Sequence, residues 1–218
     1  AYTYTEPTVF YEFAYDTAKL AKREGLYNVW ITNGMINMEP LRKISRVLDA
    51  ANIDLKAFTD RFYREVCGGV GLRPILRAIE EFHRRGVWIE LTTLLIPGLN
   101  DSREEIEELV DWVSKLDKNI PLHFSRFHPA YRMLDRNITP VETIEMAIEI
   151  ARRKLNYVYA GNVWGHARES TFCPKCGAKV IGRFGFSITE VNLEERNGKY
   201  YCKNCGEEIK IVGKVIKG

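Results

Sequence analysis

Residues 87–116 read VWIELTTLLIPGLNDSREEIEELVDWVSKL, and this stretch contains one complete strand-and-helix unit. Its first part, residues 87–98, is an apolar run that ends in Pro-Gly, which predicts a fully buried strand of the kind that parallel sheets contain. Residues 103–116 then repeat apolar side chains at helical spacing. Asp101 or Ser102 is expected to cap this helix, and acidic residues occupy its first turn, where the helix dipole favours them.

The same alternation of strand and helix continues on both sides of this unit, from the first residues to residue 162. Besides 87–98, strands are predicted at the opening residues and at 26–34, 53–58, 120–129 and 156–162. Besides 103–116, helices are predicted at 7–25, 40–52, 74–86 and 139–155, the last with Thr139 as its cap and Pro140 at its first position. Repeated βα units of this length predict a parallel sheet with right-handed crossovers.

The fold class is therefore α/β. The number of units and the buried strands favour a whole or partial (β/α) barrel over an open Rossmann sheet, because no Gly-x-Gly-x-x-Gly follows any strand. We expect two domains: a partial barrel over residues 1–165 and a small cysteine-bearing ribbon over residues 166–218.

The composition bears on whether the protein binds nucleic acid or a membrane. Hydrophobic residues make up 45% of the chain and charged residues 28%, and the net charge is only +3. Such a balance is typical of a globular protein and gives no reason to expect nucleic acid or a membrane surface as a partner. No apolar run approaches the ~18 residues of a membrane-spanning helix. We expect a cytoplasmic protein.

Polar residues gather where the predicted strands end, which in a βα barrel is the position of the active site. Singly, each has an ordinary interpretation: Asn33-Gly34 as a turn, Asp54 and Lys56 as an ion pair, His128 as a structural histidine. Polar groups at the ends of several strands, all at the same end of the barrel, are harder to explain as structural residues alone. The candidates are Thr5, Glu6, Thr32, Asn33, Gly34, Asp54, Lys56, Thr92, Thr93, Ser125, Arg126 and His128.

These strand ends resemble the radical S-adenosylmethionine (radical SAM) superfamily, and within it the branch of pyruvate formate-lyase activating enzymes. The ordered series carries the resemblance: TEP at 5–7, TNG at 32–34, DLK at 54–56, IPGLND at 96–101 and FHP at 127–129. The stretch YVYAGNVWGHARESTFCPKCG at 157–177 closely resembles the radical SAM member of the AmmeMemoRadiSam system.

The resemblance implies an enzyme in which a 4Fe-4S cluster, held by three cysteines, binds S-adenosylmethionine at its open iron. Reductive cleavage would give a 5′-deoxyadenosyl radical that takes a hydrogen atom from the substrate. By position, Thr5, Glu6, Thr32 and Asn33 would hold the methionine end. The remaining predicted cofactor-binding residues are Asp54 and Lys56 near ribose and carboxylate, Thr92 at the next strand end, and His128 near adenine or substrate. No catalytic residue is assigned.

The chain also departs from the family pattern. Tyr4-Thr5 stands where the family has two glycines, and Ile31 stands where activating enzymes have Asp. The Cys-x-x-x-Cys-x-x-Cys segment that holds the cluster in the superfamily does not occur in these 218 residues. We expect that segment, with a first βα unit, upstream of Ala1, and we expect the fragment by itself to be inactive.

Four of the five cysteines form two Cys-x-x-Cys pairs, each followed by glycine. Two such pairs predict a structural metal site, with zinc as the first choice and iron as the second. The ligands would be Cys173, Cys176, Cys202 and Cys205. The Asn197-Gly198 pair between them is typical of a hairpin turn, so a β ribbon fits the gap. Cys67 is left over as a free thiol in a loop.

Two functions from different classes remain open on the sequence. The first is a radical SAM enzyme with an unknown substrate, such as a small molecule, a peptide or a glycyl-radical protein, and an electron donor such as ferredoxin or flavodoxin. The second is a non-catalytic βα barrel whose ribbon binds a protein or nucleic acid.

Overall fold

The computed structural model describes residues 1–69 and 71–215, so the last three residues of the predicted ribbon domain lie outside the described part. Five parallel strands form one sheet in the order β1-β2-β3-β4-β5. They are Val29–Thr32 (β1), Ala50–Asp54 (β2), Trp88–Leu95 (β3), Leu122–Arg126 (β4) and Val158–Gly161 (β5). The opening residues add only an isolated parallel bridge between Tyr2 and Trp30, beside β1.

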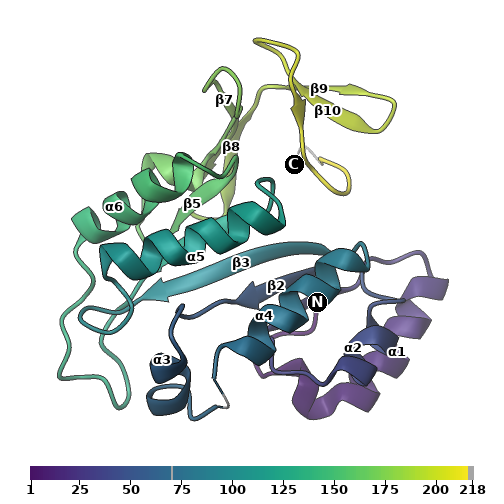
Figure 1. The fold of residues 1–218 in the computed structure, drawn as a ribbon. Helices are drawn as coiled ribbons and strands as arrows, with labels where there is room; N and C mark the ends of the chain where they lie inside the picture. Colours follow the sequence, from purple (N-terminus) through teal and green to yellow (C-terminus); the bar gives the residue numbers. More distant parts are fainter. Residues whose placement is uncertain (70, 216–218) are drawn as a thin grey trace.

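A helix or helical segment connects each strand to the next. The helices are Pro7–Phe10 (η1, a 3-10 turn), Tyr11–Arg23 (α1), Met38–Ile44 (α2), Asp60–Glu65 (α3), Arg73–Arg84 (α4), Arg103–Leu116 (α5) and Val141–Arg152 (α6). Sequential parallel strands with right-handed crossovers place all helices on one face of the sheet. Figure 1 shows this arrangement, with α4 and α5 lying in front of β2 and β3. The predicted α/β fold with a parallel sheet is confirmed.

The two faces of the sheet differ in character. Along β3 the side chains alternate between buried and half-buried, so only one face of this strand packs against helices. The buried face carries Ile89, Leu91 and Leu95, which belong to the main core. The prediction that residues 87–98 are buried on both faces is therefore wrong: Glu90 and Thr92 point to the opposite face, which we call the inner face of the sheet.

The second predicted helix, 40–52, is too long at its C-terminal end. Helix α2 ends at Ile44, and residues 50–52 belong to strand β2. The Ser45 amide and hydroxyl both donate to the Leu41 carbonyl, the hydroxyl at 2.7 Å, so the helical pattern persists to this residue. Beyond it, the Asp49 carboxylate accepts from the Asn28 amide at 2.8 Å, which holds the chain beside β1. Pairing with β1, rather than a local signal, therefore sets the start of β2.

Thr139 does not cap helix α6 as the sequence suggested. Pro140 occupies the cap position, and no side chain caps this helix. The Thr139 hydroxyl is fully buried and joins two strand ends instead, donating to the Leu95 carbonyl at 2.6 Å and accepting from the Phe127 amide at 3.1 Å. Thr139 therefore fixes the distance between the ends of β3 and β4.

Asn100 makes a similar link between the ends of β2 and β3. Its buried amide donates to the carbonyls of Lys56 at 2.6 Å and Leu94 at 2.8 Å, and its oxygen accepts from the Ile96 amide at 2.7 Å. The IPGLND motif thus contains a residue that positions Lys56. The motif by itself did not predict this role of Asn100.

Asn100→Ala is expected to lower the free energy of unfolding by about 2–4 kcal/mol, because three backbone groups lose a buried partner. Chemical denaturation of the wild type and the variant measures the difference. Asn137→Ala is the matched control, since Asn137 is exposed and should change the stability little. Equal losses for the two variants would contradict the role given to Asn100.

The C-terminal segment forms two small antiparallel sheets, which together we call the ribbon. After Ala167–Glu169 (η2), one sheet has the order β6-β7-β8, from Thr171–Phe172, Lys179–Phe184 and Ser187–Val191. The other joins Leu193–Arg196 (β9), Lys199–Cys202 (β10) and Glu208–Ile209 (β11). Asn197 and Gly198 both have positive φ, at 52° and 75°, as expected for the predicted hairpin turn between β9 and β10.

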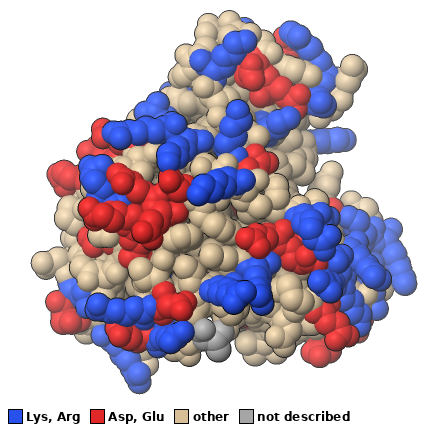
Figure 2. All heavy atoms as spheres, viewed as in Figure 1, with Lys and Arg blue, Asp and Glu red and all other residues tan. Residues whose placement is uncertain are grey.

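The molecular surface carries both signs of charge. Figure 2 shows acidic side chains gathered over α5 and basic ones over α1, α2 and the ribbon, interspersed with the opposite sign. Among the described residues, no helix is both long enough and apolar enough to cross a membrane.

Candidate functional site

Three of the predicted cofactor residues are joined by hydrogen bonds at the edge of the sheet where the strands end. Glu6 Oε1 accepts from the Thr32 hydroxyl at 2.7 Å, and Glu6 Oε2 accepts from the Asn33 amide at 2.7 Å. The same carboxylate caps η1 by accepting from the Thr8 amide at 3.2 Å. The TEP and TNG segments are therefore one structural unit, although they are far apart in the sequence.

The turn after β1 is shaped by close packing. Gly34 has a φ of +76°, and a Cβ at this position would lie 3.1 Å from side-chain carbons of both Ile53 and Ile75. Asn33 Oδ1 accepts from the Met35 amide at 2.8 Å, and the Asn33 side-chain NH₂ makes no hydrogen bond to the described residues, so it can still donate. Glycine is required here by both the conformation and the space.

Asp54 and Lys56 form a second group, at the end of β2. Lys56 Nζ lies 2.8 Å from Asp54 Oδ2, and both side chains are about one third exposed, at 37% and 35%. Beneath them the Tyr63 hydroxyl accepts from the Lys56 amide at 3.0 Å, and burial raises the pKa of Tyr63. A carboxylate and an ammonium group are thus held together with part of each open to solvent.

The other predicted cofactor residues are less tightly placed. Thr92 is the register partner of Asp54, and its hydroxyl donates to Asn52 at 3.0 Å. Thr5 and His128 are exposed, and within the described residues no hydrogen bond involves their side chains. The structure thus joins Glu6, Thr32 and Asn33, places Asp54, Lys56 and Thr92 on neighbouring strands, and leaves Thr5 and His128 at the periphery.

The four ribbon cysteines converge as predicted. All their sulfur atoms lie within 4.8 Å of one another. Cys173 Sγ is 3.6 Å from Cys205 Sγ, and Cys176 Sγ is 3.7 Å from Cys202 Sγ. A tetrahedral metal with bonds of about 2.3 Å to sulfur requires sulfur separations of about 3.8 Å, so the four thiols fit one ion.

Both metal-binding turns have the same backbone. The Gly177 amide donates to the Cys173 carbonyl and the Gly206 amide to the Cys202 carbonyl, and both glycines have a φ above +70°. The thiols themselves are unequal: burial raises the pKa of Cys173 to about 12, whereas hydrogen bonds led by the Asn204 side chain lower the pKa of Cys176 to about 6. A bound metal would hold all four as thiolates.

The inner face of the sheet carries an ion pair that the sequence reading missed. Glu90 Oε2 lies 2.9 Å from His123 Nε2, and the imidazole stacks on the Tyr159 ring with centroids 4.8 Å apart. Burial alone would raise the pKa of Glu90, but the hydrogen bond and charge of His123 outweigh this cost and lower it. A single carboxylate within an otherwise uncharged strand was the signal available in the sequence.

A parallel sheet with helices on one face, polar groups at the strand ends and a separate four-cysteine cluster together define a partial βα barrel with a cysteine ribbon. The sequence pattern of the Radical SAM superfamily matches residues 1–113. The chain belongs to the Radical SAM superfamily.

Two curated proteins illustrate the relationship. "Uncharacterized protein MJ0808" of Methanocaldococcus jannaschii is 46% identical over 214 residues, which are 97% of this chain and 62% of that protein. A "Probable GTP 3′,8-cyclase" of Thermococcus kodakarensis is 24% identical over 92% of this chain and 61% of its own length. The chain thus spans about three fifths of the curated relatives it matches.

Solved structures show the same fold. A domain of pyruvate-formate lyase-activating enzyme from Bacteroides vulgatus superposes with a TM-score of 0.65 at 19% identity, covering 74% of this chain and 97% of that domain. SuiB of Streptococcus suis bound to S-adenosylmethionine gives a TM-score of 0.57 at 14% identity, covering 72% of this chain and 38% of that one. The predicted radical SAM type of partial barrel is confirmed at the level of fold.

Membership of the superfamily implies S-adenosylmethionine and an iron–sulfur cluster. The residues of this chain fit the first but not the second. The methionine end of the cofactor has an ammonium group, which needs acceptors, and a carboxylate, which needs donors. Glu6 and Asp54 supply carboxylates, and Asn33 and Lys56 supply donors, so the donor set fits S-adenosylmethionine. The cluster needs three cysteines, and outside the ribbon this chain has only Cys67, so these residues do not form a cluster site.

Proposed function

We propose that this chain is the cofactor- and substrate-binding part of a radical SAM enzyme. The observation that carries the proposal is the pairing of the Glu6–Thr32–Asn33 unit with the Asp54–Lys56 ion pair at one edge of the sheet. In this superfamily, S-adenosylmethionine and the cluster together supply a radical that takes a hydrogen atom from the substrate.

The chain's own residues would bind and orient the cofactor. Glu6 would accept from the cofactor's ammonium group, and its anchors on Thr32 and Asn33 fix its orientation before binding. Lys56 would pair with the cofactor's carboxylate, and Asp54 would accept from ribose hydroxyls. Tyr63 and Asn100 hold the backbone of Lys56 from below, so this donor needs little reorganisation.

The cluster ligands would come from residues outside these 218, in the segment that we expect upstream of Ala1. The similarity in fold to an activating-enzyme domain supports, at a coarser level, a member of that branch. Its substrate would be a small molecule, a peptide or a glycyl-radical protein, and its electron donor a ferredoxin or flavodoxin. We further propose that the protein is cytoplasmic and that the ribbon metal is zinc rather than iron.

A non-catalytic scaffold is the second candidate, and the partly exposed Asp54–Lys56 ion pair argues against it. A purely structural pair would gain little from remaining open to solvent, since exposed pairs contribute about 0–1 kcal/mol. A ligand site, in contrast, needs charged groups that water or a cofactor can reach.

S-adenosylmethionine binding to the 218-residue chain tests the cofactor site. Without the cluster the affinity is expected to be weak, and Lys56→Met should lower it about tenfold, the cost of one hydrogen bond to a charged group. Isothermal titration calorimetry at high protein concentration measures the ratio. Lys118→Met, on an exposed loop, is the control. Equal affinity of the wild type and Lys56→Met would exclude Lys56 from the cofactor site.

A further inference from the structure

A row of four polar side chains crosses the inner face of the sheet. Asp54 is the register partner of Thr92, and Thr92 is the partner of His123 on the next strand. His123 in turn pairs with Tyr159. Register partners in a parallel sheet point to the same side, so Asp54, Thr92 and the Glu90–His123 pair share one face. With strands ~4.8 Å apart, His123 lies about 10 Å from Asp54 along the row.

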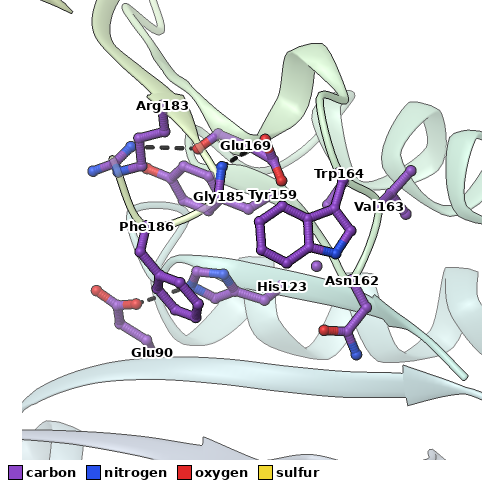
Figure 3. Close-up of a pocket in the computed structure, with 12 residues that line it drawn as sticks. Glu90, His123, Tyr159, Asn162, Val163, Trp164, Glu169, Arg183, Gly185 and Phe186 are labelled. Carbon is purple, nitrogen blue, oxygen red and sulfur yellow. Dashed lines mark hydrogen bonds and ion pairs between the residues drawn. The ribbon is translucent and has the colours of Figure 1, made fainter. Parts of the chain in front are cut away.

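A cavity of about 480 Å³ opens at the far end of this row. Figure 3 shows the residues that line it, among them Glu90, His123 and Tyr159 of the sheet and Arg183 and Phe186 of the ribbon. The loop after β5, with Trp164, closes a third side. This volume is in the range of small-molecule sites, and the ribbon supplies walls that the open side of the barrel lacks.

Aromatic rings line two sides of the cavity. Trp164 and Phe186 meet edge to face with centroids 6.5 Å apart, although Trp164 is 72% exposed and Phe186 fully exposed. Gly185 allows the Trp164 indole to approach the backbone, since a Cβ there would come within 2.4 Å of the ring. The stacked His123–Tyr159 pair lines the same cavity. Several rings around one cavity favour a flat ligand.

The polar groups of the cavity offer both an acceptor and a donor. Glu90 accepts from His123 and, at the longer distance of 3.4 Å, from Trp88, so its carboxylate keeps acceptor capacity. Arg183 donates to the Thr171 hydroxyl at 2.7 Å and retains further N–H groups. A ligand edge that carries one N–H donor beside one carbonyl would satisfy both residues.

We propose that this cavity is the substrate site, and that the substrate carries a planar heteroaromatic ring with an adjacent N–H and carbonyl on one edge, as several nucleobases do. The proposal rests on the function proposed above, because the substrate must lie on the same face as the cofactor. Trp164 stacks on the ring and Phe186, which is nearly perpendicular to Trp164, meets its edge. Glu90 accepts from the N–H of the ring and Arg183 donates to its carbonyl.

Inosine is the probe, since its base has this edge, and 1-methylinosine, in which a methyl group replaces the N–H, is its matched negative. Saturation-transfer NMR with the zinc-loaded chain measures binding. Inosine is expected to bind and 1-methylinosine to bind about tenfold more weakly. Glu90→Gln should lower the affinity for inosine about tenfold, whereas Glu149→Gln, at an exposed position on α6, should leave it unchanged.

Trp164→Ala should lower the affinity for inosine about fivefold, and Trp164→Phe should retain most of it.

Competition separates this proposal from the cofactor site. Saturating S-adenosylmethionine is expected to leave inosine bound, and Lys56→Met is expected to affect only S-adenosylmethionine. Failure of S-adenosylmethionine to bind would remove the proposed function but not the ring site. Absence of inosine binding, indifference to Glu90→Gln and Trp164→Ala, or displacement by S-adenosylmethionine would each overturn the ring site. Tyrosine binding as tightly as inosine would overturn the edge assignment.

Discussion

Cys202→Ser is expected to release the ribbon metal and unfold the ribbon, while the barrel remains folded. The ribbon packs around a small second core that it shares with Tyr157 of the barrel. The buried members of this core are Tyr157, Cys173, Val180, Ile181, Leu193, Tyr200, Cys202 and Ile209. Three of its largest apolar side chains are exposed by more than half: Phe184, Phe186 and Ile188. They add little to the buried apolar area. So small a core does not offset an ordering cost of about 1.5 kcal/mol per residue.

Metal binding changes this balance. Four thiolates on one structural ion contribute on the order of 10 kcal/mol, and most of that is folding free energy when the apo segment is unfolded. The barrel has a far larger core, formed by strands and helices together, and it contains none of the four ligands. The loss should therefore be confined to residues from about Ser170 onward.

Hydrogen exchange and metal analysis on the wild type and Cys202→Ser measure this effect. Amides of β7 to β10 should lose protection in the variant, and those of β2 to β4 should keep it. Cys67→Ser is the control, because Cys67 is exposed and lies outside the cysteine cluster. A wild type that carries no metal and still protects its ribbon amides would show that the cysteines are not a folding site.

Unfolding of the ribbon would also remove its contacts with the inner face of the sheet. The Tyr157 hydroxyl accepts from the Lys210 amide at 2.9 Å, and the Tyr159 hydroxyl lies 3.1 Å from Thr171 Oγ1. Arg183 and Phe186, two walls of the proposed substrate cavity, belong to the β7–β8 hairpin. Cys202→Ser should therefore abolish inosine binding while S-adenosylmethionine binding persists.

The sequence predicted best where local signals agree. Helix α5 runs over the predicted residues 103–116, with Ser102 capping it through the Glu105 amide at 3.2 Å, because the cap, the acidic first turn and the apolar spacing all indicate the same helix. Strand β2 was misplaced because its residues Ala50 to Asn52 have no strong strand preference. Its position is set by pairing with β1 and β3, which no local pattern reveals.

The candidate site was predictable to a similar degree. Glu6, Asn33 and Lys56 come from motifs at strand ends, so the topology brings them to one edge. Glu90 and His123 are different, since they lie within strands and acquire meaning only once the register places them side by side on the inner face. Arg183 reaches the same cavity from the ribbon, a contact between distant segments that the sequence does not encode locally.

Formation of 5′-deoxyadenosine tests the central claim most directly. The claim is that the residues at the strand ends serve radical SAM chemistry and that the cluster ligands lie outside this chain. The protein extended at its N-terminus to include the expected Cys-x-x-x-Cys-x-x-Cys segment is compared with the 218-residue chain. Both are reconstituted anaerobically with iron and sulfide, reduced with dithionite and given S-adenosylmethionine.

The extended protein is expected to release 5′-deoxyadenosine, and its Lys56→Met variant should release about tenfold less at subsaturating cofactor. The 218-residue chain should release none, since Cys67 by itself cannot hold a cluster. Chromatographic measurement of the product distinguishes the outcomes. Product from the 218-residue chain, or none from the extended protein with a fully assembled cluster, would contradict the account.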